Sequence, residues 1–190
     1  MTEVKIIAFA GMPGSGKGSC TDYLEKKYHW PVVHFGNMIY EEVQRRGLDN
    51  VKDEKFVRED MRAKEGKEVF AKHVARKIDE YISNGATTIV VDGLYSWSEF
   101  KYLSEKYGDK LVVIAVAAPR AERYRRTLAR TDSHRNYSSA EQIEERDISE
   151  IENLEKGGPI AFADYTLVND KDPETLQEKL DAIIEQIKAL

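Results

Sequence analysis

The stretch Gly11-Met12-Pro13-Gly14-Ser15-Gly16-Lys17-Gly18-Ser19 decides the fold. An apolar run, residues 6–10, precedes it, and a helical pattern follows it. A strand, a glycine-rich loop that ends in Gly-Lys, and a helix are together typical of a phosphate-binding P-loop. The glycines let backbone N–H groups converge on one concavity, and the helix adds the positive end of its dipole. The stretch therefore predicts a nucleotide site in which Lys17 binds the β- and γ-phosphates. The alternative is a turn that merely joins a strand to a helix.

The end of this loop departs from the commonest pattern. Gly18 stands where many P-loops carry a Ser or Thr that binds Mg²⁺, and Ser19 supplies a hydroxyl one residue later. The Gly-Lys-Gly-Ser ending, together with Pro13, resembles the loop of adenylate kinases and related nucleoside monophosphate kinases, which reads Gly-x-Pro-Gly-x-Gly-Lys-Gly-Thr. The resemblance implies that residues 11–19 bind ATP. It also implies that phosphates and water hold most of the Mg²⁺ shell, with Ser19 contributing through water.

Composition limits the classes of protein that fit. A chain of 190 residues suits one α/β domain, and a net charge of −5 argues against a dedicated nucleic-acid binder. No apolar run approaches the ~20 residues of a membrane span. A single cysteine, Cys20, excludes an internal disulfide and fits a reducing compartment. With no signal peptide evident, we expect a cytoplasmic monomer or homodimer that binds small molecules, without membrane or nucleic-acid partners.

Strand and helix patterns alternate along the chain. Strands are expected over residues 4–10, 30–35, 87–91, 111–117 and 165–168. Helices are expected over residues 16–27, 38–46, 53–84 with a break near Gly66, 96–107, 119–131, 139–156, and from 173 to the end. Gly157-Gly158-Pro159 is expected to break the sixth of these. The alternation predicts a P-loop NTPase fold, with a five-stranded parallel sheet and helices on both faces. We expect a single domain over 1–190, with a helical acceptor-binding insert at about 36–85 and an arginine-rich lid at about 119–150.

Asp92 is the second chemical signal. It follows the apolar strand Thr88–Val91, which is the Walker B arrangement of a carboxylate beside the loop. Such a carboxylate orients Mg²⁺ or its waters. The alternative is an ordinary Asp-Gly turn at the end of a strand. Asp92-Gly93-Leu94 also resembles the Asp-Gly-Phe of adenylate kinases, although Tyr95-Ser96 stands where that family has Pro-Arg.

The third signal is a helix rich in arginine. Arg123, Arg126 and Arg130 are spaced by three and four residues and are expected to share one helical face. Phosphoryl transfer needs charge neutralisation over the moving group, so we predict catalytic roles for Lys17, Asp92, Arg126 and Arg130. A solvated helix face is the alternative. Arg135 and Arg146 are expected to reach in from the lid loop and the next helix, although Arg146-Asp147 also fits an ordinary surface pair.

The whole chain resembles a family of P-loop kinases described as adenylate-kinase-related or dephospho-CoA-kinase-like. The resemblance rests on the P-loop, residues 34–38, Asp92-Gly93, residues 145–147 and residues 163–165 with Asn169. It implies that Asn169 contacts the adenine of ATP. It also places the acceptor site between His34 and Gly85. The residues expected there or beside it are Asn37, Tyr40, Arg58, Arg62 and Tyr95.

The predicted function is that of an ATP- and Mg²⁺-dependent small-molecule kinase. The γ-phosphate of ATP would pass to a nucleotide or nucleotide-like acceptor, as in nucleoside monophosphate kinases. Phosphorylation of a hydroxyl, as in dephospho-CoA kinases, is one alternative. An ATP-binding switch or assembly factor with little transfer is the other.

Overall fold

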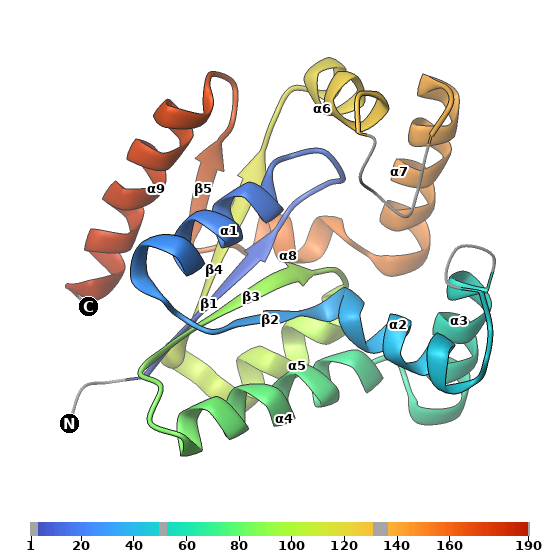
Figure 1. The fold of residues 1–190 in the computed structure, drawn as a ribbon, viewed down its shortest axis with the longest axis horizontal. Helices are drawn as coiled ribbons and strands as arrows, with labels where there is room; N and C mark the ends of the chain where they lie inside the picture. Colours follow the sequence, from blue (N-terminus) through green and yellow to red (C-terminus); the bar gives the residue numbers. More distant parts are fainter. Residues whose placement is uncertain (1–3, 50–52, 131–136, 190) are drawn as a thin grey trace.

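Five parallel strands form one sheet in the computed structural model, which describes residues 4–49, 53–130 and 137–189. The strands are β1 (Lys5–Ala10), β2 (Val32–His34), β3 (Thr88–Leu94), β4 (Leu111–Ala117) and β5 (Tyr165–Val168). Their order across the sheet is β2-β3-β1-β4-β5, and every neighbouring pair is parallel (Figure 1). The predicted α/β class and five-stranded parallel sheet are therefore confirmed.

Helices connect these strands and cover both faces of the sheet. They are α1 (Lys17–Tyr28), α2 (Phe35–Arg45), α3 (Glu54–Glu65), α4 (Val69–Ser83), α5 (Trp97–Tyr107), the short 3-10 helix η1 (Gly108–Lys110), α6 (Arg120–Leu128), α7 (Ala140–Leu154), α8 (Gly157–Ala161) and α9 (Pro173–Lys188). None of the helices in the described ranges is both long and apolar enough to span a bilayer.

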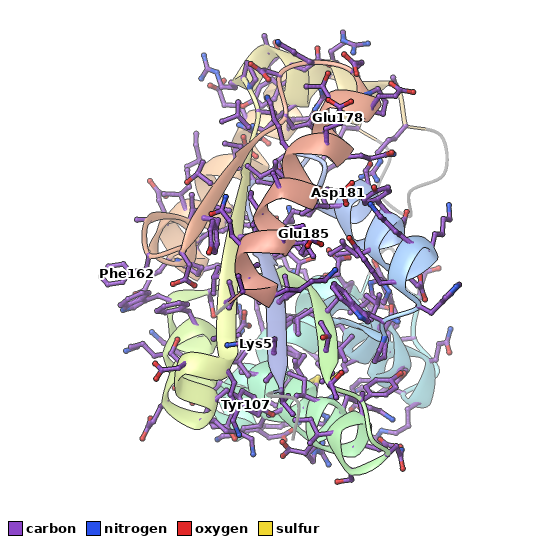
Figure 2. The ribbon with its side chains drawn as sticks, turned by 90° about the vertical axis from the view of Figure 1, so that its left-hand side faces the viewer. Lys5, Tyr107, Phe162, Glu178, Asp181 and Glu185 are labelled. Atoms are coloured by element: carbon purple, nitrogen blue, oxygen red, sulfur yellow. The ribbon has the colours of Figure 1, made fainter. Side chains whose placement is uncertain are left out.

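The core lies on both sides of β1, because alternate residues of this strand point to opposite faces. Ile7 packs in a cluster with Leu24 of α1 and Leu180 of α9. Ile6, its neighbour, packs on the other face with Ile78 of α4 and Leu103 of α5. This two-sided burial explains why β1 reads as a continuous apolar run. Figure 2 shows α9 from outside, with the charged residues Glu178, Asp181 and Glu185 along its length.

The carboxyl ends of four strands meet at one edge of the sheet. β1 leads into the P-loop, β3 carries Asp92, β4 leads into α6, and Asn169 follows β5. The Asn169 N–H donates to the Ala117 carbonyl at 2.7 Å and so joins the ends of β4 and β5. Ligands of open parallel sheets bind at this edge, and the functional residues are gathered there.

Several boundaries differ from the prediction; β2 is shorter than expected, and α6 ends at Leu128. α2 begins at Phe35, directly after β2, because the buried Phe35 ring anchors the first turn in the core. β3 continues to Leu94, since Gly93 adopts a φ of 89° that lets the strand pair irregularly with Ala10. Gly157–Ala161 forms α8 instead of breaking a helix.

The break after α7 occurs earlier, at Glu155. This residue adopts a left-handed φ of 52° and turns the chain. Gly158 has another use: a Cβ there would lie 2.7 Å from the Trp97 ring, so this glycine lets α8 pack closely on α5. The turn on one side and the close packing on the other hold Lys156 in place.

Candidate active site

The P-loop forms a concave turn between β1 and α1. Gly14 and Gly16 have φ angles of 75° and 105°, which side chains other than glycine rarely adopt. A Cβ on Gly14 would lie 2.7 Å from Thr127 Oγ1, so that glycine lets α6 pack directly on the loop. Gly16 caps α1 without a side-chain hydrogen bond, and the first turn of α1 has no acidic residue. Ser15 Oγ is buried without a hydrogen-bond partner in the described ranges. Unpaired donors at a helix N-terminus fit an anion such as a phosphate group.

The Lys17 side chain folds back over this loop. Its ammonium donates hydrogen bonds to the carbonyl oxygens of Gly11 at 2.8 Å and Met12 at 3.1 Å. Burial, followed by repulsion from the Lys156 ammonium, lowers the pKa of Lys17 to about 7. A phosphate group beside Lys17 would favour its charged form again, because opposite charge offsets both effects.

An open pocket of about 580 Å³ lies over the P-loop, and we call it the P-loop pocket. Its cationic side chains are Lys17, Arg125, Arg126, Arg130, Arg146 and Lys156. Asp92 is the one acidic side chain among the described residues that line it. Such a surplus of positive charge suits a ligand with several negative charges, such as a polyphosphate.

Asp92 enters the P-loop pocket from β3. Strand register places His34 of β2 beside it, with His34 Nδ1 3.1 Å from Asp92 Oδ2. This hydrogen bond raises the pKa of His34. Ser19, exposed on α1, lines the same pocket. Within the described ranges, no group of three or more His, Cys, Asp or Glu side chains could hold a metal ion unaided. Mg²⁺ in phosphate sites usually takes one or two carboxylates and completes its shell with phosphates and water, and Asp92 fits that pattern.

The arginines of α6 and Arg130, which follows the end of this helix at Leu128, have two different surroundings. Arg126 and Arg130 line the P-loop pocket, and Arg126 Nε donates to Glu122 at 2.8 Å. Arg123 was predicted to share their face but is buried instead. Its guanidinium donates to the Pro13 carbonyl at 3.0 Å and to Asp147 at 2.7 Å. The prediction for Arg123 was wrong because α6 rests directly on the loop, so this turn of the helix faces protein rather than the pocket.

Arg146 reaches into the P-loop pocket from α7, as expected. Its Nε donates to Glu150 at 2.8 Å and its NH1 to the Tyr137 hydroxyl at 2.8 Å. The alternative of an Arg146-Asp147 surface pair was wrong, since Asp147 is buried and bonds to Arg123. Arg135 lies outside the described residues.

Asn169 supports the P-loop from behind. Its side chain is buried, and its Nδ2 donates to the Ser15 carbonyl at 2.8 Å. It is not among the residues that line the P-loop pocket. Asn169 therefore holds the loop backbone in this structure, and its contact with adenine stays a prediction.

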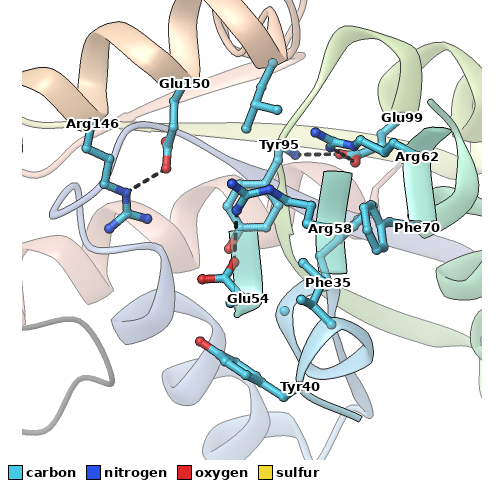
Figure 3. A pocket seen from close by; sticks show the side chains of 13 residues that line it. Phe35, Tyr40, Glu54, Arg58, Arg62, Phe70, Tyr95, Glu99, Arg146 and Glu150 are labelled. Carbon is cyan, nitrogen blue, oxygen red and sulfur yellow. Dashed lines mark hydrogen bonds and ion pairs between the residues drawn. The ribbon is translucent and has the colours of Figure 1, made fainter. Parts of the chain in front are cut away.

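A second pocket, of about 90 Å³, opens between α2, α3, α5 and α7 (Figure 3). Phe35, Phe70 and Tyr95 give it aromatic walls. Its charged walls are three pairs: Arg58–Glu54 at 2.9 Å, Arg62–Glu99 at 3.0 Å and Arg146–Glu150 at 2.8 Å. We call it the ion-pair pocket. Each arginine faces a glutamate, so the charges on its walls balance.

The two pockets adjoin. Tyr40, Tyr95 and Arg146 line both of them. Of the residues predicted for an acceptor site, Tyr40, Arg58, Arg62 and Tyr95 therefore lie together. A molecule in the ion-pair pocket would border a molecule in the P-loop pocket.

Asn37 lies elsewhere. It is exposed on α2 and lines a separate open groove of about 480 Å³ with His34, Met38 and His73. Because α2 begins at Phe35, Gly36, Ile39 and Tyr40 turn toward the ion-pair pocket, whereas Asn37 and Met38 turn away from it. The predicted acceptor contact of Asn37 does not agree with this placement.

Five charged residues that line the two pockets were not among the predicted site residues: Glu54, Glu99, Arg125, Glu150 and Lys156. Glu99 was expected only as a member of a capping box with Ser96, and it has that role at the start of α5 as well. Lys156 is 1% exposed, bonds to Glu150, and has its ammonium 4.8 Å from the Tyr95 ring centre. One feature of the sequence distinguishes Lys156: it ends a segment without lysine that begins after Lys110.

This chain has relatives among known proteins. A family model described as an AAA domain matches residues 10–144. A UPF0200 protein of Thermococcus onnurineus is 33% identical over 187 residues, which cover 97% of this chain and 98% of that protein. A UPF0200/UPF0201 protein of Archaeoglobus fulgidus is 34% identical over 184 residues, 96% of this chain. The match covers 55% of the latter protein, so the chain spans about half its length.

Solved structures share the fold. TT1252 from Thermus thermophilus has a TM-score of 0.63 and 24% identity, with 97% of this chain and 98% of that chain covered. Shikimate kinase from Bacteroides thetaiotaomicron has a TM-score of 0.61 and 11% identity, with the same coverage. These identities show the fold alone, which is that of P-loop kinases. The chain belongs to the UPF0200 family, with an AAA domain over residues 10–144.

Proposed function

We propose that this protein is an ATP-dependent small-molecule kinase. The observation that carries the proposal is the shared wall of Tyr40, Tyr95 and Arg146 between the cationic P-loop pocket and the ion-pair pocket. A kinase must hold its donor and acceptor in contact, because positioning supplies most of its catalysis. Two adjoining pockets of different chemistry meet that need.

The residues of the P-loop pocket have distinct roles in this proposal. The backbone of residues 11–19 and the Lys17 ammonium hold the phosphates. Arg126 and Arg130 neutralise the charge that develops during transfer. Asp92 orients the metal, and Ser19 contributes through water. When bound, ATP with Mg²⁺ supplies an activated phosphoryl group and a stabilised leaving group.

Segments outside the sheet would close the site. Residues 119–150 include Arg126, Arg130 and Arg146, which line the P-loop pocket. Residues 36–85 supply Tyr40, Arg58 and Arg62 to the ion-pair pocket. We therefore assign the first segment as the lid and the second as the acceptor-binding insert. Closure would exclude water, which competes with the acceptor for the phosphoryl group.

The proposed acceptor is a nucleotide or nucleotide-like molecule. Aromatic walls such as Tyr95 and Phe35 suit a base, and the pocket arginines suit polar groups. A hydroxyl acceptor, as in dephospho-CoA, is the second candidate, and the balanced charges favour it. A phosphate acceptor would bring its negative charge beside Glu54, Glu99 and Glu150, whereas a hydroxyl would not.

The test is transfer of labelled phosphate from ATP·Mg²⁺ to a panel of acceptors. The panel contains the nucleoside monophosphates, dephospho-CoA and water alone, and Lys17→Met protein provides the background. We expect a labelled product with one acceptor, absent with the variant. Hydrolysis alone, or tight ATP binding without turnover, would instead support an ATP-binding switch or assembly factor.

A further inference from the structure

Lys156 lies where the two pockets meet. It lines the P-loop pocket, while its partner Glu150 lines the ion-pair pocket. The Tyr95 ring, which borders both pockets, lies under its ammonium at 4.8 Å. A phosphoryl group that moves from one pocket to the other must pass this junction.

The local backbone holds Lys156 at this place. The left-handed turn at Glu155 reverses the chain after α7, and the Lys156 N–H donates to the Glu150 carbonyl at 3.3 Å. On the other side, Gly158 packs against the Trp97 ring and fixes the start of α8. The side chain is thus positioned by rigid elements on both sides.

The charge of Lys156 is only partly compensated. Its one carboxylate partner among the described residues, Glu150, also accepts a hydrogen bond from Arg146. Two cations therefore share one anion in a buried setting, with Lys17 near enough to repel Lys156. An excess of buried positive charge is unfavourable unless a negative charge lies beside it. A negatively charged ligand at the junction would supply this compensating charge.

We propose that Lys156 is a second phosphate-binding cation that leaves Glu150 to contact the terminal phosphate of a bound nucleoside triphosphate. Arg146 keeps Glu150 and Tyr137 as partners when Lys156 moves, so the carboxylate stays compensated. Lys17 binds the phosphates from the P-loop side, and Lys156 binds the last of them from the acceptor side. This inference rests on the proposed function for the identity of its ligand.

The position of Lys156 makes the site selective for a nucleoside triphosphate over a diphosphate. The terminal phosphate of a triphosphate would lie at the junction, whereas a diphosphate would end short of it on the P-loop. Loss of the Lys156 charge should therefore weaken binding of ATP more than binding of ADP. Loss of the Lys17 charge should weaken both.

The experiment measures dissociation constants of ATP and ADP by calorimetry. For Lys156→Met we expect the preference for ATP over ADP to fall about tenfold, the size of a lost charged hydrogen bond. Lys156→Arg should keep the preference within about threefold, since it keeps the charge. Lys106→Met, which removes a lysine of α5 that pairs with Asp79 of α4, is the control and should match wild type.

A purely structural role for Lys156 has a different signature. It would lower the affinity of both nucleotides equally, with a lower unfolding temperature, and that result would overturn the proposal. The double variant Glu150→Gln with Lys156→Met removes both charges of the pair together, so it tests selectivity if Lys156→Met does not fold. If neither variant folds, the ¹⁵Nζ resonance of Lys156 in wild type decides, because it must shift with ATP and not with ADP.

These outcomes separate this inference from the proposed function. Wild-type protein that binds neither nucleotide would remove the kinase proposal itself. Wild-type protein that binds ATP, with an unchanged preference in a folded Lys156→Met variant, would remove only the role of Lys156. Transfer activity is not needed for either conclusion.

Discussion

The P-loop pocket and the ion-pair pocket share a wall but handle charge in opposite ways. Six cations line the first, and Asp92 is the one acid that the described residues place there. In the second, each of three arginines bonds to a glutamate of the same wall. The same residue type therefore has two uses. Arg126 and Arg130 line a pocket with a surplus of positive charge, which suits an anionic ligand. Arg58 and Arg62 are instead bonded to glutamates of the ion-pair pocket.

This contrast separates binding from stability. The side chains that line the P-loop pocket carry a surplus of positive charge that a ligand would offset, so removing one cation should impair function more than folding. Charges in the ion-pair pocket compensate one another in the folded chain, so removing one should impair folding first.

The largest effect is expected for Lys17→Met. Transfer, or hydrolysis where no acceptor is present, should fall by about 10²–10³-fold, as for other lost transition-state donors. The ligand-free protein should unfold at no lower temperature, because the partners of Lys17 are two carbonyls and its charge is disfavoured by burial. Turnover assays and calorimetric melting check both parts, with exposed Lys26→Met on α1 as the control. An equal loss of stability would contradict the assignment.

The opposite pattern is expected for Glu99→Gln. Glu99 is 1% exposed and accepts hydrogen bonds from Arg62 at 3.0 Å and from the Ser96 N–H at 2.9 Å. A neutral amide leaves Arg62 without its charged partner, so we expect a loss of about 2–3 kcal/mol in the free energy of unfolding. Urea titration measures it. Glu105→Gln, exposed on the same helix, should change stability by less than about 0.5 kcal/mol.

The Glu150 pair should make stability depend on acid pH. Burial by itself raises the pKa of Glu150, but the Lys156 and Arg146 cations outweigh it and lower that pKa to about 2. The unfolded chain takes up a proton near pH 4.5, so the pair stabilises the fold above pH 4.5 and loses this effect as the pH falls toward 2.

Urea titrations of wild type and Glu150→Gln at pH 5.5 and pH 3 test this dependence. The advantage of wild type over the variant should shrink by about 2 kcal/mol at the lower pH. Glu145→Gln, on the exposed side of α7, is the control and should change stability by less than about 0.5 kcal/mol at pH 5.5. If the stability difference between wild type and Glu150→Gln is the same at pH 3 as at pH 5.5, Glu150 is not ionised in the folded protein.

Local sequence patterns predicted the fold and the P-loop pocket well. Glycine spacing before Lys17, the apolar run before Asp92 and the spacing of Arg126 and Arg130 are all short-range signals. They place residues at strand ends, and a parallel sheet gathers strand ends at one edge. Arg123 was the exception, because its burial depends on how α6 packs on the loop.

The ion-pair pocket was harder to predict because it gathers side chains from α2, α3, α5 and α7, although two of its pairs, Arg58–Glu54 and Arg146–Glu150, each lie within one helix. Arg62 meets Glu99 across 37 residues of chain. Lys156 meets Glu150 only because Glu155 adopts a left-handed conformation, which few non-glycine residues do. Asn37 was placed wrongly because α2 begins earlier than its sequence suggests, which rotates the side chain to the other groove. Composition and spacing do not report such packing.

The smallest effect is expected for Arg126→Ala, and it tests whether surplus charge serves the transition state. Arg126 lines the P-loop pocket with a guanidinium that bonds to Glu122, so its loss leaves only a half-buried carboxylate that water can reach. Turnover should fall by about tenfold, with ATP affinity changed by less than about threefold, because the charge that Arg126 meets develops during transfer. Arg120→Ala, an exposed change nearly two turns away on α6, removes a partner of Glu144 and should leave both constants unchanged. Equal losses of turnover and affinity would instead place Arg126 in ground-state binding, where it would act like the P-loop backbone.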